Sequence, residues 1–81
     1  MPREPKRGRT ITAPEWWLQE ATAQKRALGI INEEIGRRAG HLMGAAAIDE
    51  SRVSRCLTGD VSTFDLVNAI SHVLGIPPCV F

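Results

Sequence analysis

Apolar residues recur at helical spacing along most of the chain, and glycines interrupt the pattern. Apolar positions at every third or fourth residue predict amphipathic helices, because one helical turn takes 3.6 residues. Helices are expected over residues 12–28, 32–40, 49–57 and 62–75, with one short extra helical turn within 41–47. No stretch alternates clearly between apolar and polar residues, so we expect no strand. The pattern therefore predicts an all-α fold, a compact arrangement of four to five helices.

The ends of the first two helices carry capping signals. Thr12 and Glu15 are spaced for a capping box, with Pro14 tolerated in the first turn. Gly29 is expected to end this helix, because glycine readily adopts the left-handed conformation that follows a helix. Asn32 is expected to cap the second helix, whose first turn is acidic, as the helix dipole favours. One face of the first helix is expected to carry four apolar side chains: Trp17, Leu18, Ala21 and Leu28.

The segment 49–57 has the most informative pattern. Asp49 is a good N-cap residue, and Gly59 supplies the stop. Its apolar stripe comprises Ile48, Val53, Cys56 and Leu57. The side chains that point away from this stripe are of types that reach DNA base edges and phosphates: Glu50, Ser51, Arg52 and Arg55. An ordinary surface helix also has one polar face, so the neighbouring segments decide the interpretation.

Three segments together resemble the lambda-repressor-like (Xre, Cro/CI) family of helix-turn-helix DNA-binding domains. Residues 29–40 (GIINEEIGRRAG) resemble its second helix, 48–59 (IDESRVSRCLTG) its recognition helix, and 63–77 (TFDLVNAISHVLGIP) its fourth helix. Seven residues, 41–47, lie where the family passes directly into the turn, and this lengthened turn is similar to the POU-specific variant. A second register would place helix 2 at 40–46. It puts Ala47 and Met43 at poorly suited positions, so we favour the first register.

The resemblance implies a sequence-specific, DNA-binding transcriptional regulator, a small repressor of the Cro/CI or antitoxin type. The helix 49–57 would enter the major groove of double-stranded DNA. Base-edge candidates are Glu50, Ser51, Arg52 and Arg55, while Asn32 and Thr58 would contact phosphates. Members of this fold usually read two half-sites, so we expect a homodimer on an inverted-repeat operator.

Charge is distributed unevenly along a chain whose net charge is only +1. Residues 1–9 hold one acidic side chain and four basic ones: Arg3, Lys6, Arg7 and Arg9. We therefore divide the chain into a flexible basic arm, residues 1–11, and a helix-turn-helix domain, residues 12–81. The arm either binds DNA, along the phosphates or in a minor groove, or is a solvated tail, and the sequence favours neither.

Other functional classes have little support in the sequence. Cys56 and Cys79 form no disulfide framework, and with His41 and His72 they match no common zinc spacing. We expect no metal, no cofactor and no enzymatic activity, because no catalytic motif occurs. The sequence contains no run of eighteen apolar residues, so we expect no membrane span. The N-terminus is rich in proline and arginine and lacks an apolar region, so we do not expect it to be a signal peptide. Cys56 is expected in the core, and the protein in the reducing cytoplasm.

The alternative function is a protein-interaction module, such as an antitoxin bound to its toxin or an inhibitor of another protein. Trp16 and Trp17 are adjacent, so only one can face the core. The other is exposed, covered by a partner, or half-buried beneath the arm. The apolar tail, residues 79–81, is a second candidate surface. The run Ala45–Ala47 is expected to form the short extra turn, packed against the body; alternatively, this linker lies over the DNA backbone.

Overall fold

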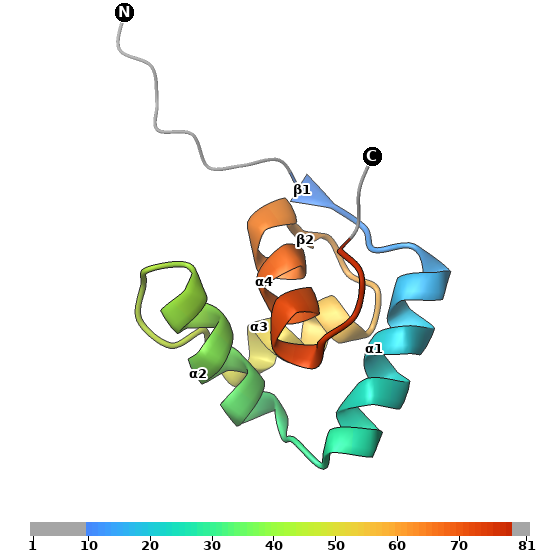
Figure 1. Cartoon of the computed structure of the whole chain (residues 1–81). Helices are drawn as coiled ribbons and strands as arrows, with labels where there is room; N and C mark the ends of the chain where they lie inside the picture. The colour runs from blue at the N-terminus through green and yellow to red at the C-terminus, as the bar shows by residue number, and fades with distance from the viewer. Residues whose placement is uncertain (1–9, 79–81) are drawn as a thin grey trace, which may run out of the picture.

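The computed structural model describes residues 10–78, which form four helices and two very short strands. Their order is β1 (Thr10–Ile11), α1 (Glu15–Leu28), α2 (Asn32–Leu42), α3 (Glu50–Leu57), β2 (Ser62–Thr63) and α4 (Phe64–Leu74). Figure 1 shows α4 at the centre, with α1 and α2 on opposite sides of it. Helix α4 packs against both α1 and α2, and α3 contacts the same two helices. The predominantly helical architecture predicted from the sequence is confirmed.

The core is organised around Trp17, the largest fully buried side chain of the described residues. Its indole Nε1 donates a hydrogen bond of 2.7 Å to Ser71 Oγ, and Ser71 Oγ donates in turn to the Val67 carbonyl at 2.9 Å. This chain of hydrogen bonds satisfies the polar atoms of both buried side chains, as burial requires. Trp16 is 46% exposed. The expectation that only one of the two tryptophans faces the core is therefore confirmed.

Helix α1 begins later than the capping box predicted. Its N-cap residue is Pro14, no side chain caps it, and Thr12 is exposed. The reason is the proline, which disfavours helical geometry in the residue before it and so prevents Thr12 from acting as the cap. The predicted end is correct, because Gly29 adopts the left-handed conformation with φ of 67°. Leu28, expected on the buried face, is largely exposed.

The start of α2 also differs from the prediction. Ile31 is the N-cap residue, and Asn32 is the first residue of the helix. No side chain makes a capping hydrogen bond at this end. The helix follows the favoured register and continues to Leu42. The run Ala45–Ala47 forms no extra helical turn and is exposed, so that expectation is wrong. The run instead belongs to a connection whose backbone lies against Gly36 and Gly40 of α2, and three alanines alone are too few to repay helix nucleation.

Two elements complete the fold near the start of α4. The expectation of no strand was wrong, since β1 pairs antiparallel with β2 in the register Thr10 with Thr63 and Ile11 with Ser62. Residues 10 and 11, assigned to a flexible arm, therefore belong to the folded body. Thr63 caps α4 by accepting a hydrogen bond from the Leu66 amide at 3.3 Å. The inward positions predicted for this helix are confirmed as buried or partly buried: Phe64, Val67, Ile70, Val73 and Leu74.

Candidate nucleic-acid interface

Helix α3 has one buried face and one exposed face. Val53 and Cys56 are buried, and Ile48 and Leu57 pack partly buried against the same core. The opposite face carries the predicted exposed set: Glu50, Ser51, Arg52 and Arg55. The segregation of apolar and polar residues predicted for this helix is confirmed. The structure thus gathers these four polar side chains on one short, well-anchored helix.

The N-cap residue of α3 is the predicted one, but its side chain does not make the predicted capping hydrogen bond. Asp49 is the N-cap residue, yet its carboxylate makes no hydrogen bond to the first-turn amides. Its Oδ2 instead accepts from Ser51 Oγ at 2.6 Å. At the other end, Gly59 has φ of 99°, and the Asp60 amide donates to the Arg55 carbonyl at 3.0 Å. The backbone therefore ends the helix as the sequence predicted, through a left-handed glycine.

The connection from α2 to α3 lies directly against two glycines of α2. The Ile48 amide donates to the Gly36 carbonyl at 3.0 Å, and the Ala45 amide donates to the Gly40 carbonyl at 2.9 Å. A Cβ on Gly36 would collide with the Ile48 carbonyl, and one on Gly40 with the Ala46 carbonyl. The absence of side chains at these positions lets the connection approach the helix backbone. This contact fixes the residue that leads into α3.

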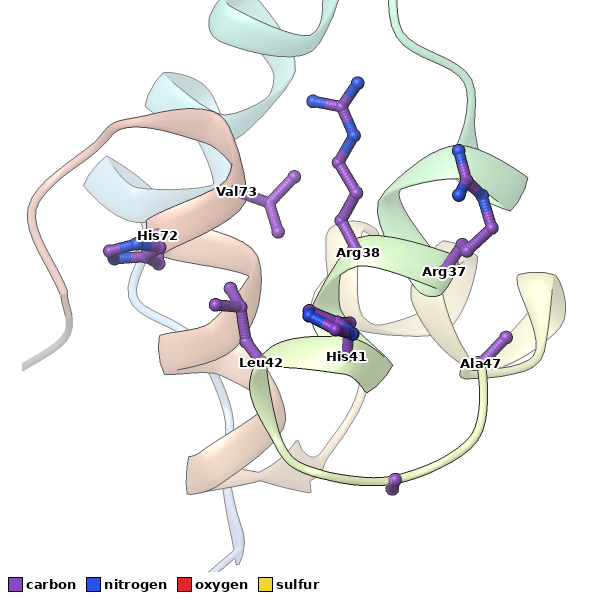
Figure 2. Close-up of a pocket in the computed structure, with 8 residues that line it drawn as sticks. Arg37, Arg38, His41, Leu42, Ala47, His72 and Val73 are labelled. Atoms are coloured by element: carbon purple, nitrogen blue, oxygen red, sulfur yellow. The ribbon is translucent and has the colours of Figure 1, made fainter.

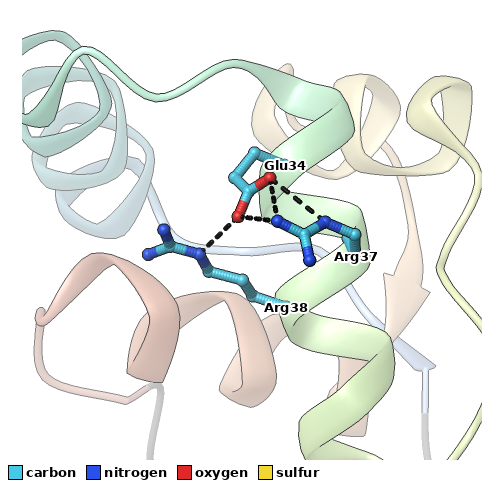
Figure 3. A network of polar contacts seen from close by, with 3 residues as sticks. All are labelled: Glu34, Arg37 and Arg38. Carbon is cyan, nitrogen blue, oxygen red and sulfur yellow. Dashed lines mark hydrogen bonds and ion pairs between the residues drawn. The ribbon is translucent and has the colours of Figure 1, made fainter.

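The arginines of α3 differ from those of α2 in their partners. Arg37 and Arg38 both bind the Glu34 carboxylate, at 2.6 Å and 2.7 Å, as Figure 3 shows. Hydrogen bonds from Arg37 and then Arg38 hold the pKa of Glu34 below its usual value. Within residues 10–78, the side chains of Arg52 and Arg55 form no ion pair or hydrogen bond. Their donors are therefore available to an external anion.

The two predicted phosphate-contacting residues lie on different elements. Thr58 is exposed directly after α3, and its hydroxyl donates to the Arg55 carbonyl at 3.0 Å. Asn32 is half-buried at the first position of α2, and its Oδ1 is buried without a hydrogen-bond partner. This oxygen can only accept a hydrogen bond, so its burial does not test the predicted phosphate contact, which needs a donor. Within the described chain, no hydrogen bond joins Asn32 to α3.

A small pocket beside α3 contains residues that sequence reasoning missed. Arg52 and Arg55 line it together with Thr10, Val61, Ser62, Thr63 and Leu66, around a volume of about 180 Å³. The strand pair brings Thr10 to this place from far along the chain. Strands of two residues have no detectable periodicity, so no sequence signal pointed to Thr10, Ser62 or Thr63. The predicted arm contacts Arg3, Lys6, Arg7 and Arg9 lie outside the described residues.

A second, larger cleft lies between α2 and α4. Figure 2 shows Arg38, His41 and Leu42 of α2 on one side, and His72 and Val73 of α4 on the other. The cleft is open, with a volume of about 670 Å³, and no carboxylate lines it. Its lining combines apolar side chains with basic ones.

The described residues include one cysteine and several side chains of types that bind metal ions. Cys56 is buried, and its burial raises the pKa of the thiol, which disfavours the reactive thiolate. The predicted placement of Cys56 in the core is confirmed. Among residues 10–78, no three potential metal-ligating side chains come together. No helix in this range has the length and apolar character needed to cross a membrane.

The chain was also compared with known proteins. No family model matches it, and neither a curated protein nor a solved structure does. Any functional conclusion therefore rests on its own residues and geometry.

Proposed function

We propose that this chain is a sequence-specific DNA-binding transcriptional regulator of the lambda-repressor-like helix-turn-helix type. The observation that carries the proposal is the face of α3, which presents four polar side chains to solvent while its opposite side is anchored in the core. A helix of this diameter fits the major groove of B-form DNA. The order α2, connection, α3 and the resemblance of residues 29–77 to that family support the same conclusion.

In this proposal, α3 enters the major groove, and α2 lies behind it. Glu50 and Ser51 are placed in the first turn, where recognition helices contact base edges. Glu50 is suited to accept from a cytosine amino group, and serine contacts several bases. Arg52 and Arg55 supply positive charge to the same face. The tight packing of residues 45–48 on α2 gives α3 a fixed orientation, which groove recognition needs.

Selection from a random pool of DNA duplexes tests this proposal most directly. We expect the full-length protein to enrich one related set of sites, organised as an inverted repeat. The double variant Arg52→Ala, Arg55→Ala is expected to lose about 1–3 kcal/mol of binding free energy for each arginine and to keep its helical content. The control is Arg26→Ala, an exposed arginine of α1. Absence of any enriched site, or full affinity in the double variant, would contradict the proposal.

A protein-interaction module is the second candidate, and exposed apolar side chains favour it. Trp16 is about half exposed, and Leu42 and Met43 are exposed beside the cleft between α2 and α4. Large exposed aromatic residues are enriched at protein interfaces. A salt-dependent gel shift on genomic fragments separates the two candidates. DNA binding predicts a shift that weakens with added salt, whereas a module with only a protein partner predicts none.

A further inference from the structure

We infer that the pocket between α3 and the β1–β2 strand pair is a phosphate-binding site that holds one DNA phosphodiester. The inference rests on the proposed function and assigns Arg52 and Arg55 a role within it. These two arginines would position the protein on the DNA backbone, leaving base recognition to Glu50 and Ser51 in the first turn of α3. Four observations support it: the donors that line the pocket, their freedom from partners, its size and its place on α3.

The lining of the pocket consists of donors and apolar atoms. Arg52 and Arg55 are three residues apart, so they are neighbours on one face of α3. Thr10, Ser62 and Thr63 add three hydroxyl groups, of which that of Ser62 already donates to the Asp60 carbonyl at 3.5 Å, and no acidic side chain lines the pocket. Guanidinium groups bind phosphate oxygens through paired N–H donors, and hydroxyl groups add further donors. This set of groups matches a tetrahedral oxyanion and would repel a cation.

The key donors remain free in the protein. The Arg52 and Arg55 guanidinium groups have no partner among residues 10–78, whereas Arg37 and Arg38 are both bound to Glu34. Thr63 Oγ1 accepts a hydrogen bond from the Leu66 amide. A hydroxyl group has one proton to give, and that of Thr63 is not used by this contact. The pocket therefore contains donors whose hydrogen-bonding capacity is unsatisfied by the described chain.

The size and position of the pocket are compatible with a phosphodiester. The pocket volume of about 180 Å³ accommodates a phosphate with bound water but is small for a drug-sized ligand. Glu50 and Ser51 do not line it and lie in the first turn of α3. Ser51 precedes Arg55 by four residues, so the two share one face of the helix, one turn apart. The pocket residues adjoin the strand pair, and the first turn carries the groups suited to base edges. A helix lying in the major groove meets backbone phosphates along its flank in this way.

Free phosphate and a DNA phosphodiester share this chemistry, so a phosphate titration and a DNA-binding assay are needed together to distinguish them. The full-length protein is titrated with inorganic phosphate at constant ionic strength, and the Nε–H signals of the arginines are followed by NMR. We expect saturable shifts at Arg52 and Arg55 and none at Arg26, the exposed control on α1. The variant Thr63→Val removes a hydroxyl from the pocket; because this hydroxyl also caps α4, its folding is checked by circular dichroism. Absence of saturable shifts in the parent protein would overturn the inference.

DNA binding provides the second arm, with variants that keep the charge. Arg52→Lys and Arg55→Lys retain a cation but lose the paired donors of guanidinium. We expect each to weaken binding about three- to tenfold, to the same degree on the selected duplex and on a scrambled duplex. Arg26→Lys is the matched control and should leave the affinity for both duplexes unchanged. A loss of affinity confined to the selected duplex would show that the arginine contacts bases, and it would overturn the inference.

The two arms separate failure of the inference from failure of the proposed function. If the parent protein binds neither duplex but phosphate still shifts Arg52 and Arg55, the DNA-binding proposal fails and the site is assigned to a free phosphate ligand. If the protein binds DNA while its two arginines determine base preference, the DNA-binding proposal stands and the phosphate assignment fails.

Discussion

Replacing Gly36 with alanine tests whether the packing of the connection against α2 holds α3 in place. The added methyl group would meet the backbone carbonyl of Ile48 and would lie 3.3 Å from Val53 Cγ2. The closest atoms belong to the backbone, so rotation of a flexible side chain cannot relieve the collision. The segment that leads into α3 has to move, and the hydrogen bond from the Ile48 amide to the Gly36 carbonyl is strained or broken.

One stabilising and two destabilising effects determine the change in the free energy of unfolding. Alanine favours the helical state over glycine by about 1 kcal/mol in a helix interior. Against this, inserting a methyl group into a packed contact costs about 1–3 kcal/mol. Loss of the Ile48–Gly36 hydrogen bond adds about 1 kcal/mol. We therefore expect a net destabilisation of about 1–3 kcal/mol, which for a domain of this size lowers Tm by about 5–20 °C.

Urea and thermal unfolding, followed by far-UV circular dichroism, measure this effect. Ala23→Gly, on the exposed surface of α1, is the matched control for the propensity term alone. It should destabilise the protein by about 1 kcal/mol, because it reverses the alanine advantage without any packing change. If Gly36→Ala is as stable as the parent protein or more stable, helix propensity outweighs the collision. The close approach of the connection to α2 would then not constrain α3.

Four further predictions concern stability, charge and assembly. Ser71→Ala leaves the buried indole N–H of Trp17 without its partner, so we expect a loss of about 1–3 kcal/mol in urea unfolding, and an unchanged midpoint would contradict this. The pKa of Glu34 is lowered in the folded protein, so the stability that it contributes is present above its unfolded-state pKa and is lost as pH falls through its folded-state pKa. Glu34→Gln should therefore flatten the acidic part of the curve of unfolding free energy against pH, measured at low salt. Deletion of residues 1–9 should make the slope of log affinity against log salt shallower by about 0.9 for each phosphate that these residues neutralise, whereas an unchanged slope would identify a solvated tail. Sedimentation with an operator duplex should show two protein copies on half-sites whose centres are about 10 base pairs apart, and one copy per duplex would contradict a homodimer.

The sequence predicted the helices well where apolar spacing and a glycine stop agreed. Helix α3 is the best example, because Val53 and Cys56 are buried as their spacing required and Gly59 adopts the expected left-handed conformation. Helix starts were less predictable. A capping pattern at Thr12 was overridden by Pro14, and the cap expected at Asn32 moved one residue earlier. The first error comes from the backbone restriction that a proline imposes on the residue before it; nothing in the structure explains the second.

Features that depend on distant residues could not be predicted from local patterns. The strand pair joins Thr10 to Thr63, and the resulting pocket joins both to Arg52 and Arg55. The exposed alanine run likewise follows from tertiary contacts, because residues 45–48 lie against Gly36 and Gly40 rather than forming a helix. The sequence identified the arginines as candidates for DNA contact. It offered no means of finding the hydroxyl groups beside them.

The central position of α4 has a consequence for the synthesis of this protein. This helix follows the other three along the chain, yet α1 and α2 pack against it, and the Trp17 indole binds its Ser71. A ribosome adds about 5–20 residues per second, so the 46 positions from Leu28 to Leu74 take about 2–9 s. During that interval, the nascent chain has made α1 but not the surface that covers it. Folding into the core must therefore wait until α4 has emerged, and chaperones have their main opportunity to bind the apolar face of α1 before then.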